Sequence, residues 1–157
     1  LGHGPEAAVA ARAFCDYVEE HVGEDVEHLF RGATVALSNT RGAAAALVRV
    51  DTQEWRMEFA GVGNIEVRML RDHRTTSPGI CMPGIVGRPI RTIRSFFPDL
   101  EAGDLLFLHS DGVVSTRCDF NAYYRLSISE MAEKIVADHG KWHDDASCLV
   151  ALVVAGE

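Results

Sequence analysis

The sequence predicts an α+β domain, in which helices and a mainly antiparallel sheet form separate layers. The chain has 157 residues, of which 47% are hydrophobic and 24% are charged, a composition typical of one compact domain with a sizeable core. Segments with helical periodicity open the chain, and strand-length apolar segments follow them. This separation favours the α+β class over the alternating pattern of a doubly wound dinucleotide-binding fold.

Two consecutive helices are expected first. Residues 5–22 place apolar side chains at helical spacing, and Pro5 and Glu6 suit the first turn of a helix. A second helix is expected at residues 25–38, although Gly32 is an unfavourable residue in a helix interior.

Three strand-length segments follow the helices, at residues 43–51, 55–60 and 65–70. The Gly-Val-Gly-Asn sequence at residues 61–64 has the composition of a hairpin turn between the last two. The three segments therefore predict an antiparallel meander.

A long surface loop is expected at residues 72–89, because three prolines and three glycines interrupt any regular element there. Further strands are expected at residues 91–97 and 104–109. The second of these contains the uninterrupted apolar run 105–108, which is typical of a central strand covered on both faces.

The last expected elements are a helix and a strand. Ser127 and Glu130 have the spacing of a capping box, apolar residues follow at helical spacing, and Gly140 marks the end of the helix. Residues 146–155 are expected to form a buried strand that closes the sheet.

Composition narrows the classes of partner. Lys and Arg number 15 and Asp and Glu number 23, which gives a formal net charge of −8 and disfavours binding to nucleic acids and to anionic membrane surfaces. No apolar stretch approaches the roughly 20 residues needed to cross a bilayer. The four cysteines are scattered without a C-x-x-C pair, as in reduced cytosolic proteins, so a cytoplasmic location is expected.

Acidic residues stand at the ends of two apolar strands. Ser110, Asp111 and Gly112 follow the strand at 104–109, while Asp144 and Asp145 precede the final strand. If those strands are neighbours, the carboxylates of Asp111 and Asp144 come together, and two like charges in one place indicate a bound cation or a shared proton. Oxygen ligands favour Mg²⁺ or Mn²⁺. Asp-Gly and Asp-Asp are also common turn formers, so an ordinary turn is the alternative.

Several other positions could have a functional role, and each also has a purely structural explanation. The backbone around Gly2, His3 and Gly4 precedes a helix and would suit a phosphate or a metal-bound water; a plain tight turn is the alternative, and a kinase glycine box a weaker one. His109 is either a group supporting the site or a buried core histidine. Arg41 is either an anchor for an anionic partner or a cation at a helix end.

Six short motifs, taken in order, resemble a known family. They are Leu-Gly-His-Gly-Pro-Glu-Ala at 1–7, Arg-Gly-Ala at 41–43, Gly-Val-Gly-Asn at 61–64, Gly-Ile-Val-Gly at 84–87, His-Ser-Asp-Gly at 109–112 and Asp-Asp-Ala-Ser at 144–147. Together they resemble the SpoIIE-like branch of the metal-dependent serine/threonine protein phosphatases of type 2C, and within it the RsbX-type phosphatases of bacterial stressosome signalling.

The resemblance implies a four-layer αββα sandwich of two mainly antiparallel sheets, with one phosphatase domain over residues 1–157. It implies a two-metal Mn²⁺ or Mg²⁺ centre, for which Asp111 and Asp144 match the family's metal ligands and Asp145 the neighbouring polar position. The attacking group is then a metal-activated water, with no catalytic protein nucleophile.

The resemblance also implies a substrate and its surroundings. Phosphoserine or phosphothreonine on STAS-domain or stressosome proteins is the expected substrate, with no nucleic acid or membrane partner. Gly2, His3, Gly4, Ser110 and Gly112 are the positions expected next to the phosphate.

One departure from the family concerns the residues before the opening motif. There the family has an Asp-Gly pair that contributes metal ligands, and the strand that carries it; both are absent from the sequence as given. We expect the sequence to be part of a longer protein. The alternative is a catalytically impaired phosphatase-fold module that acts by binding a partner.

Overall fold

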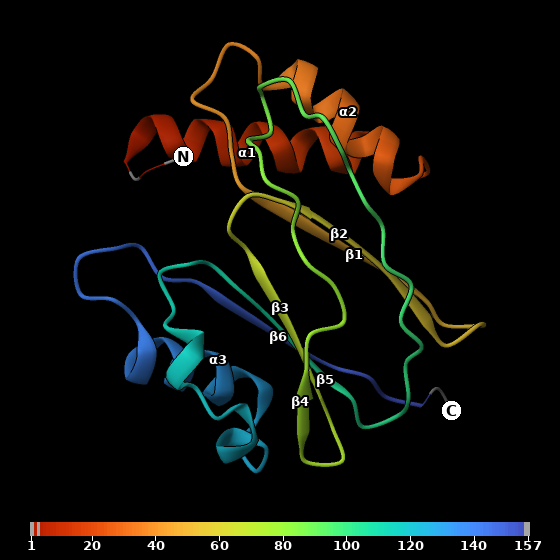
Figure 1. Cartoon of the computed structure of the whole chain (residues 1–157), viewed down its shortest axis with the longest axis vertical. Coiled ribbons are helices and arrows are strands. Elements are labelled where there is room, and N and C mark those ends of the chain that lie inside the picture. Colours follow the sequence, from red (N-terminus) through yellow and green to blue (C-terminus); the bar gives the residue numbers. More distant parts are fainter. Residues whose placement is uncertain (1, 3, 156–157) are drawn as a thin grey trace. The chain divides into compact units, whose positions relative to one another are not determined.

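The computed structural model describes residue 2 and residues 4–155, which divide into two compact units (Figure 1). The first unit comprises Leu1–Val50, Glu58–Ile65 and Gly79–Phe97, and the second comprises Asp51–Met57, Glu66–Pro78 and Pro98–Glu157. In the described residues, no helix is long and apolar enough to span a membrane.

Two helices lead the first unit, as predicted. Helix α1 (Pro5–Glu20) begins after Gly4, and helix α2 (Val26–Ala36) begins after Asp25, whose carboxylate accepts a hydrogen bond of 2.9 Å from the backbone N–H of His28. The structure explains the unfavourable Gly32. A Cβ atom there would lie 1.8 Å from the Tyr17 hydroxyl oxygen, so the glycine lets α1 and α2 approach closely.

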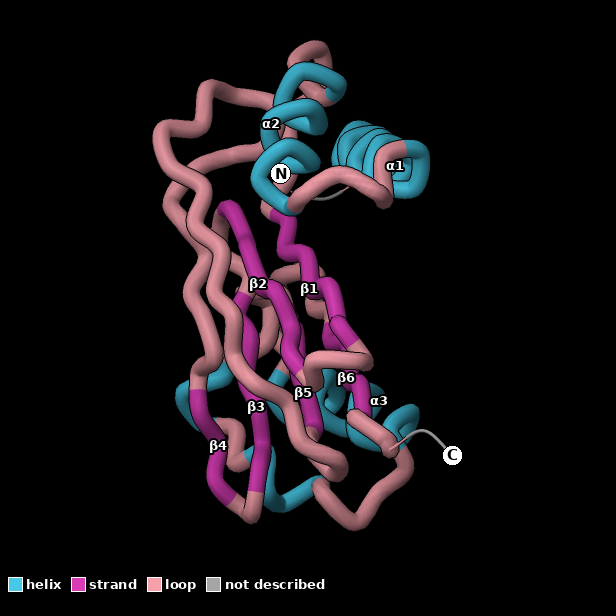
Figure 2. The backbone as a smooth tube through the Cα atoms, turned by 90° about the vertical axis from the view of Figure 1, so that its right-hand side faces the viewer, coloured by secondary structure: helices cyan, strands magenta, loops and turns pink. Residues whose placement is uncertain are grey.

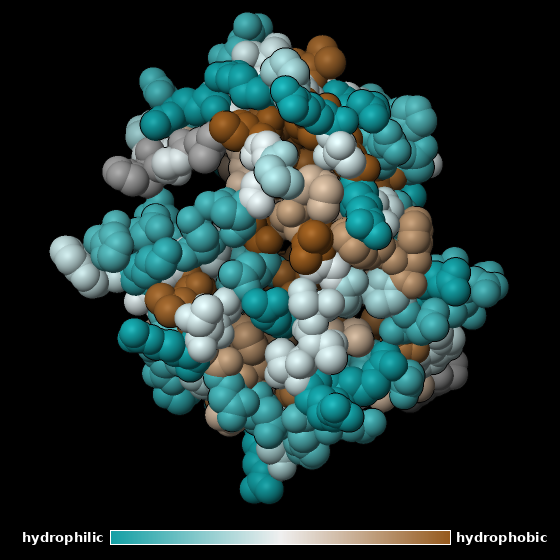
Figure 3. All heavy atoms as spheres, viewed as in Figure 1, coloured by the Kyte–Doolittle hydropathy of each residue, from teal (hydrophilic) through white to brown (hydrophobic). Residues whose placement is uncertain are grey.

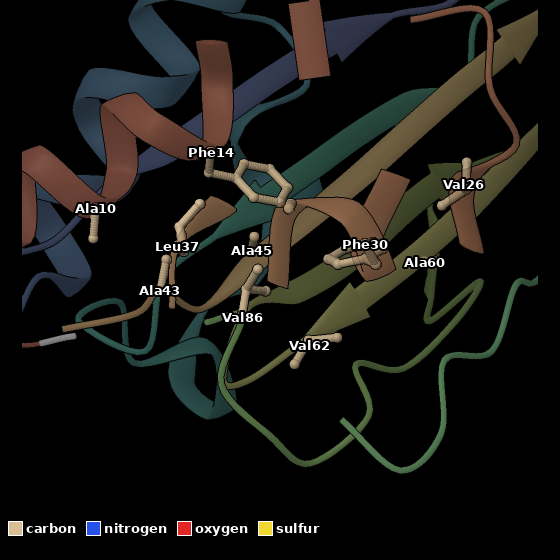
Figure 4. Packing of buried hydrophobic residues seen from close by; sticks show 11 residues of the cluster. Ala10, Phe14, Val26, Phe30, Leu37, Ala43, Ala45, Ala60, Val62 and Val86 are labelled. Carbon is tan, nitrogen blue, oxygen red and sulfur yellow. The ribbon is translucent and has the colours of Figure 1, made fainter. Parts of the chain in front are cut away.

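The core of the first unit lies between these helices and the strand residues below them (Figure 4). The rings of Phe14 and Phe30 have centroids 5.8 Å apart, and Phe30 has no exposed surface. They pack with Ala45 of strand β1 (Ala45–Asp51) and Val62 of strand β2 (Arg56–Val62), which form a two-stranded antiparallel sheet. Burial of these apolar groups stabilises the unit.

The second unit contains a four-stranded antiparallel sheet in the order β4-β3-β5-β6 (Figure 2). Its strands are β3 (Glu66–Arg71), β4 (Arg74–Thr76), β5 (Leu105–His109) and β6 (Cys148–Leu152). The central position predicted for β5 is confirmed, since β5 pairs with β3 on one side and β6 on the other. Phe107 in its middle has no exposed surface.

Helix α3 (Ile128–His139) has the predicted capping box. The Ser127 hydroxyl accepts a hydrogen bond from the Glu130 N–H, while the Glu130 carboxylate accepts one of 2.9 Å from the Ser127 N–H. Met131 and Ile135 of α3 join Phe107 in the core of the second unit, with short 3₁₀ helices Ser115–Arg117 and Phe120–Tyr123 preceding α3.

The predicted meander is wrong, because β2 and β3 belong to different sheets. Gly61 lies within β2 instead of a hairpin turn. A Cβ on Gly61 would lie 2.1 Å from the Cys81 sulfur, and Gly63 has a φ of +104°. Gly61 therefore permits close packing, and Gly63 permits a left-handed backbone conformation. Hairpin turns are also rich in glycine, so the sequence does not distinguish these uses.

The strand predicted at residues 91–97 is also absent from the described structure as a regular element. Phe96 and Phe59 exchange backbone hydrogen bonds of 2.8 and 2.9 Å as an isolated bridge. Pro89 and Pro98 flank the segment, and neither has a backbone N–H with which to extend the pairing.

The loop predicted at residues 72–89 begins with a regular element. Asp72 and His73 have φ values of 47° and 62° and form the tight turn between β3 and β4, which is typical of a two-residue hairpin. The remainder of the segment is irregular, as predicted.

Strand β6 is shorter and more exposed than predicted. It is an edge strand in the described sheet, with 57% of Leu149 and 45% of Leu152 exposed. An apolar run does not reveal whether a strand has one neighbour or two, so the position of β6 in the sheet could not be predicted from its sequence.

Polar residues cover much of the visible face in Figure 3.

We predict that Phe30→Ala lowers the free energy of unfolding by about 3–5 kcal/mol, because it leaves a cavity in a fully buried cluster. Val35→Ala, on the exposed face of the same helix, should change it by less than about 0.5 kcal/mol. Urea denaturation measures both, and equal losses would contradict this account of the core.

Candidate functional site

The pairing of β5 with β6 brings the two acidic segments side by side. Its register places His109 opposite Cys148. Beyond that pair, the Ser110 N–H donates to the Ser147 carbonyl (3.1 Å), and the Ser147 N–H donates to the Ser110 hydroxyl oxygen (3.0 Å). The sequence left open whether these two strands are neighbours, and the structure pairs them. Asp111 comes just after β5, and Asp145 comes just before β6.

Gly112 fixes how closely the two segments approach. A Cβ atom at this buried position would lie 2.1 Å from the Asp145 carbonyl oxygen and 2.8 Å from the Ala146 Cα. The Gly112 carbonyl accepts a hydrogen bond of 2.8 Å from the Lys141 N–H, which ties down the start of the loop that carries Asp144. Only a residue without a side chain permits this contact.

The three candidate carboxylates, Asp111, Asp144 and Asp145, are all exposed. The Asp145 N–H donates to Asp144 Oδ1 (3.0 Å), and Lys141 Nζ lies 4.0 Å from Asp144 Oδ2. Both contacts orient the Asp144 side chain within its own loop.

The donor chemistry of these segments fits Mg²⁺ or Mn²⁺, because exposed carboxylates are the hard oxygen ligands that these ions prefer. Across residue 2 and residues 4–155, however, no three His, Cys, Asp or Glu side chains gather as a complete metal-binding group. The described side chains would therefore supply part of a coordination shell.

A polar network that the sequence did not reveal supports the end of β5. Glu66 pairs with His109 in the β3–β5 register, and its carboxylate accepts hydrogen bonds from the Ser115 hydroxyl (2.8 Å) and from Arg68 Nη2 (2.5 Å). Glu66 Oε2 also lies 3.9 Å from His109 Nε2. The approach of Glu66 to His109 depends on strand register, and the contact with Ser115 depends on the path of the chain after β5, so no motif in the sequence predicts them.

His109 is a buried histidine, and only 2% of it is exposed. Its Nδ1 lies 3.0 Å from the Ser110 carbonyl oxygen, which only accepts, so Nδ1 carries the proton and donates. Nε2 has no hydrogen-bond partner among the described residues, and the ring stacks on Phe120. The hydrogen bond to Ser110 connects this core residue to the segment that carries Asp111.

The expected positions near the N-terminus belong to the first unit. Gly2 has a φ of +70°, and a Cβ on it would lie 3.1 Å from Arg41 Nη2. The Gly4 carbonyl accepts hydrogen bonds of 3.1 Å from two amides in the first turn of α1, while His3 lies outside the described residues. Arg41 Nη1 lies 3.7 Å from the Glu6 carboxylate, so Arg41 is at the start of α1.

Cys148, which lies beside the site, and the nearby Cys118 are not suited to act as nucleophiles. Burial raises the pKa of the Cys148 thiol to about 11, and burial with the nearby Cys148 raises that of Cys118 to about 11 as well. Both remain thiols near neutral pH, and only a thiolate is a strong nucleophile.

Comparison with solved structures identifies the class of this fold. The crystal structure of RsbX in complex with magnesium matches with a TM-score of 0.79 at 23% identity, over 96% of this chain and 75% of that one. A structure described as "The bacterial stressosome: a modular system that has been adapted to control secondary messenger signaling" matches with a TM-score of 0.87 at 33% identity, over 96% and 79% of the two chains. The fold is that of RsbX-type phosphatases, and the predicted α+β class is confirmed.

Sequence comparison then identifies the family. The profile described as "Stage II sporulation protein E (SpoIIE)" matches residues 1–154, and the chain belongs to this family. It is 24% identical over 113 residues to the phosphoserine phosphatase RsbX of Bacillus subtilis (strain 168). That match covers 72% of this chain and 57% of the relative's length.

We predict that Gly112→Ala destabilises the fold by about 1–3 kcal/mol, because the new methyl group would overlap the Asp145 carbonyl oxygen. Gly23→Ala is the matched control, since no atom lies within 4 Å of the position of its Cβ. Thermal unfolding of the two variants tests this close contact, which an unchanged melting temperature for Gly112→Ala would rule out.

Proposed function

We propose that this chain is a metal-dependent protein phosphatase that removes phosphate from serine or threonine of a bacterial stress-signalling protein. The observation that carries the proposal is the β5–β6 pairing, which sets the Asp111 segment against the segment of Asp144 and Asp145. Family membership and the similarity to a phosphoserine phosphatase support the same activity.

Asp111 and Asp144 would hold the divalent ions, with Asp145 as a further ligand. Mg²⁺ or Mn²⁺ in a two-metal site would activate water and neutralise the phosphoryl oxygens. The crystal structure of the similar RsbX contains magnesium, which supports this type of ion.

The chain's own residues position the acidic side chains and do not attack phosphorus. Ser110 holds the start of the Asp111 turn through its two hydrogen bonds with Ser147, and Gly112 receives the backbone of the opposite loop. The Lys141 ammonium lies beside Asp144 and would offset part of its charge. Fixing both segments before a ligand arrives lowers the cost of arranging the carboxylates.

The proposed substrates are phosphorylated STAS-domain or stressosome proteins in the cytoplasm, and residues 1–157 would form one phosphatase domain. The stressosome is the subject of one of the two similar structures described above, which supports this type of partner. The acidic net charge disfavours nucleic acids and anionic membranes as partners.

A phosphatase-fold module that acts by binding alone is the second candidate. It is favoured by one observation: the described residues do not assemble three side-chain ligands of the kind a metal requires. Such a module would retain the fold and lose the affinity for metal.

We predict that the chain releases inorganic phosphate from a phosphoserine protein in the presence of Mn²⁺, and that EDTA abolishes this activity. Asp111→Asn should reduce the rate by about 100-fold or more, because removal of a supporting residue of a metal site already costs about 10–100-fold. A malachite green assay measures the released phosphate.

Asp16→Asn, which removes an exposed carboxylate from α1, is the control for the change in charge and should retain full activity. Equal activity of Asp111→Asn and the unmodified chain would contradict the proposed mechanism. Absence of both Mn²⁺ binding and turnover would favour the binding module.

A further inference from the structure

Trp142 is the most solvent-exposed of the large hydrophobic side chains that the structure describes, with 94% of its surface accessible. Its neighbour His143 makes an edge contact with the indole, at a centroid distance of 5.1 Å. Tryptophan has a large apolar surface that is favourable to bury, and Trp55, the other tryptophan, is partly buried. Removing this exposed indole from water by contact with another molecule would be energetically favourable.

Trp142 lies in a turn whose backbone is held by hydrogen bonds. The preceding residue, Lys141, donates its backbone N–H to the Gly112 carbonyl (2.8 Å), and the Asp144 N–H donates to the Lys141 carbonyl (3.3 Å). Gly140 forms a β-bridge with Val113 just before the turn. The indole is therefore displayed on a backbone that is already ordered, which lowers the entropic cost of binding a partner through it.

The turn is continuous with the candidate site. Trp142 lies two residues before Asp144, and the same hydrogen bond that anchors the turn ends at Gly112, next to Asp111. Tryptophan is enriched among the residues that contribute most to protein–protein binding. The neighbouring Lys141 adds a positive charge, which suits a partner that carries a phosphate.

We propose that Trp142 is the apolar anchor by which the phosphorylated protein substrate docks beside Asp111 and Asp144. This inference rests on the proposed phosphatase function. The occupant is a folded protein with an apolar pocket for the indole near its phosphorylated residue. The net charge of −8 argues against an anionic membrane surface in this place.

The first test compares a large and a small substrate of the full chain. With a STAS-domain protein phosphorylated on serine, Trp142→Ala should raise KM by about 10-fold. With p-nitrophenyl phosphate, which offers no protein surface for the indole to bind, kcat/KM should change by less than about twofold. Trp142→Phe should recover part of the loss, because it retains an aromatic ring.

Val22→Ala, which truncates another exposed apolar side chain in the first unit, is the control and should leave both substrates unaffected. An unchanged KM for the phosphoprotein in Trp142→Ala would overturn the proposal, as would an equal loss with both substrates.

A second test needs no turnover, so it separates this inference from the proposed activity. In Trp55→Phe the indole of Trp142 is the only tryptophan fluorophore. Addition of the phosphorylated STAS-domain protein should shift its emission to shorter wavelength as the ring leaves water. A shift without hydrolysis would refute the phosphatase and retain the docking site.

An unchanged emission spectrum at saturating partner would overturn the docking site. A shift produced instead by anionic vesicles, or by raising the concentration of the chain alone, would also overturn it, since the occupant would then be a membrane or a second copy.

Discussion

Backbone pairing between β5 and β6 is the interaction on which the candidate site depends. The two strands join segments of the chain that are nearly forty residues apart, and the reciprocal hydrogen bonds of Ser110 and Ser147 extend the pairing past the strand ends. At this point Gly112 lies against the backbone of Asp145, at a distance that no side chain would allow. The acidic turn and the acidic loop are therefore held by backbone contacts and by the Ser110 hydroxyl, and their carboxylates are left exposed to bind a ligand.

Around the β5–β6 junction, some residues support the structure and others are available for chemistry. Arg68 and the Ser115 hydroxyl both donate to the Glu66 carboxylate. The buried His109, which is opposite Glu66 in the β3–β5 register, donates to the Ser110 carbonyl. These contacts stabilise the backbone just before the Asp111 turn. Cys118 and Cys148 are partly buried, and their raised pKa values keep both as unreactive thiols at neutral pH. The groups left for phosphate chemistry are the exposed carboxylates, which is consistent with catalysis through metal-bound water.

The parts of this structure that sequence reasoning predicted are those with local signals. Asp25 and Ser127 cap the helices that they were expected to begin, and the unbroken apolar run of β5 lies at the centre of its sheet. The sequence placed acidic residues at the ends of β5 and β6, and the structure supplies the pairing of these strands that the sequence left open. The metal ligands themselves stay a prediction.

The errors arose where distant contacts decide the structure. Gly61 and Gly63 have the composition of a hairpin, but the packing of Cys81 and Ala44 is what requires them. Leu149 is exposed on a strand that lies at the edge of the described sheet, and the contact of Glu66 with His109 follows from strand register. None of these leaves a pattern in a single sequence.

Anomalous diffraction from crystals grown with Mn²⁺ tests the central claim most directly. The account predicts a manganese peak in contact with carboxylate oxygens of both Asp111 and Asp144. A peak bound elsewhere, or none beside these two side chains at saturating Mn²⁺, would contradict it.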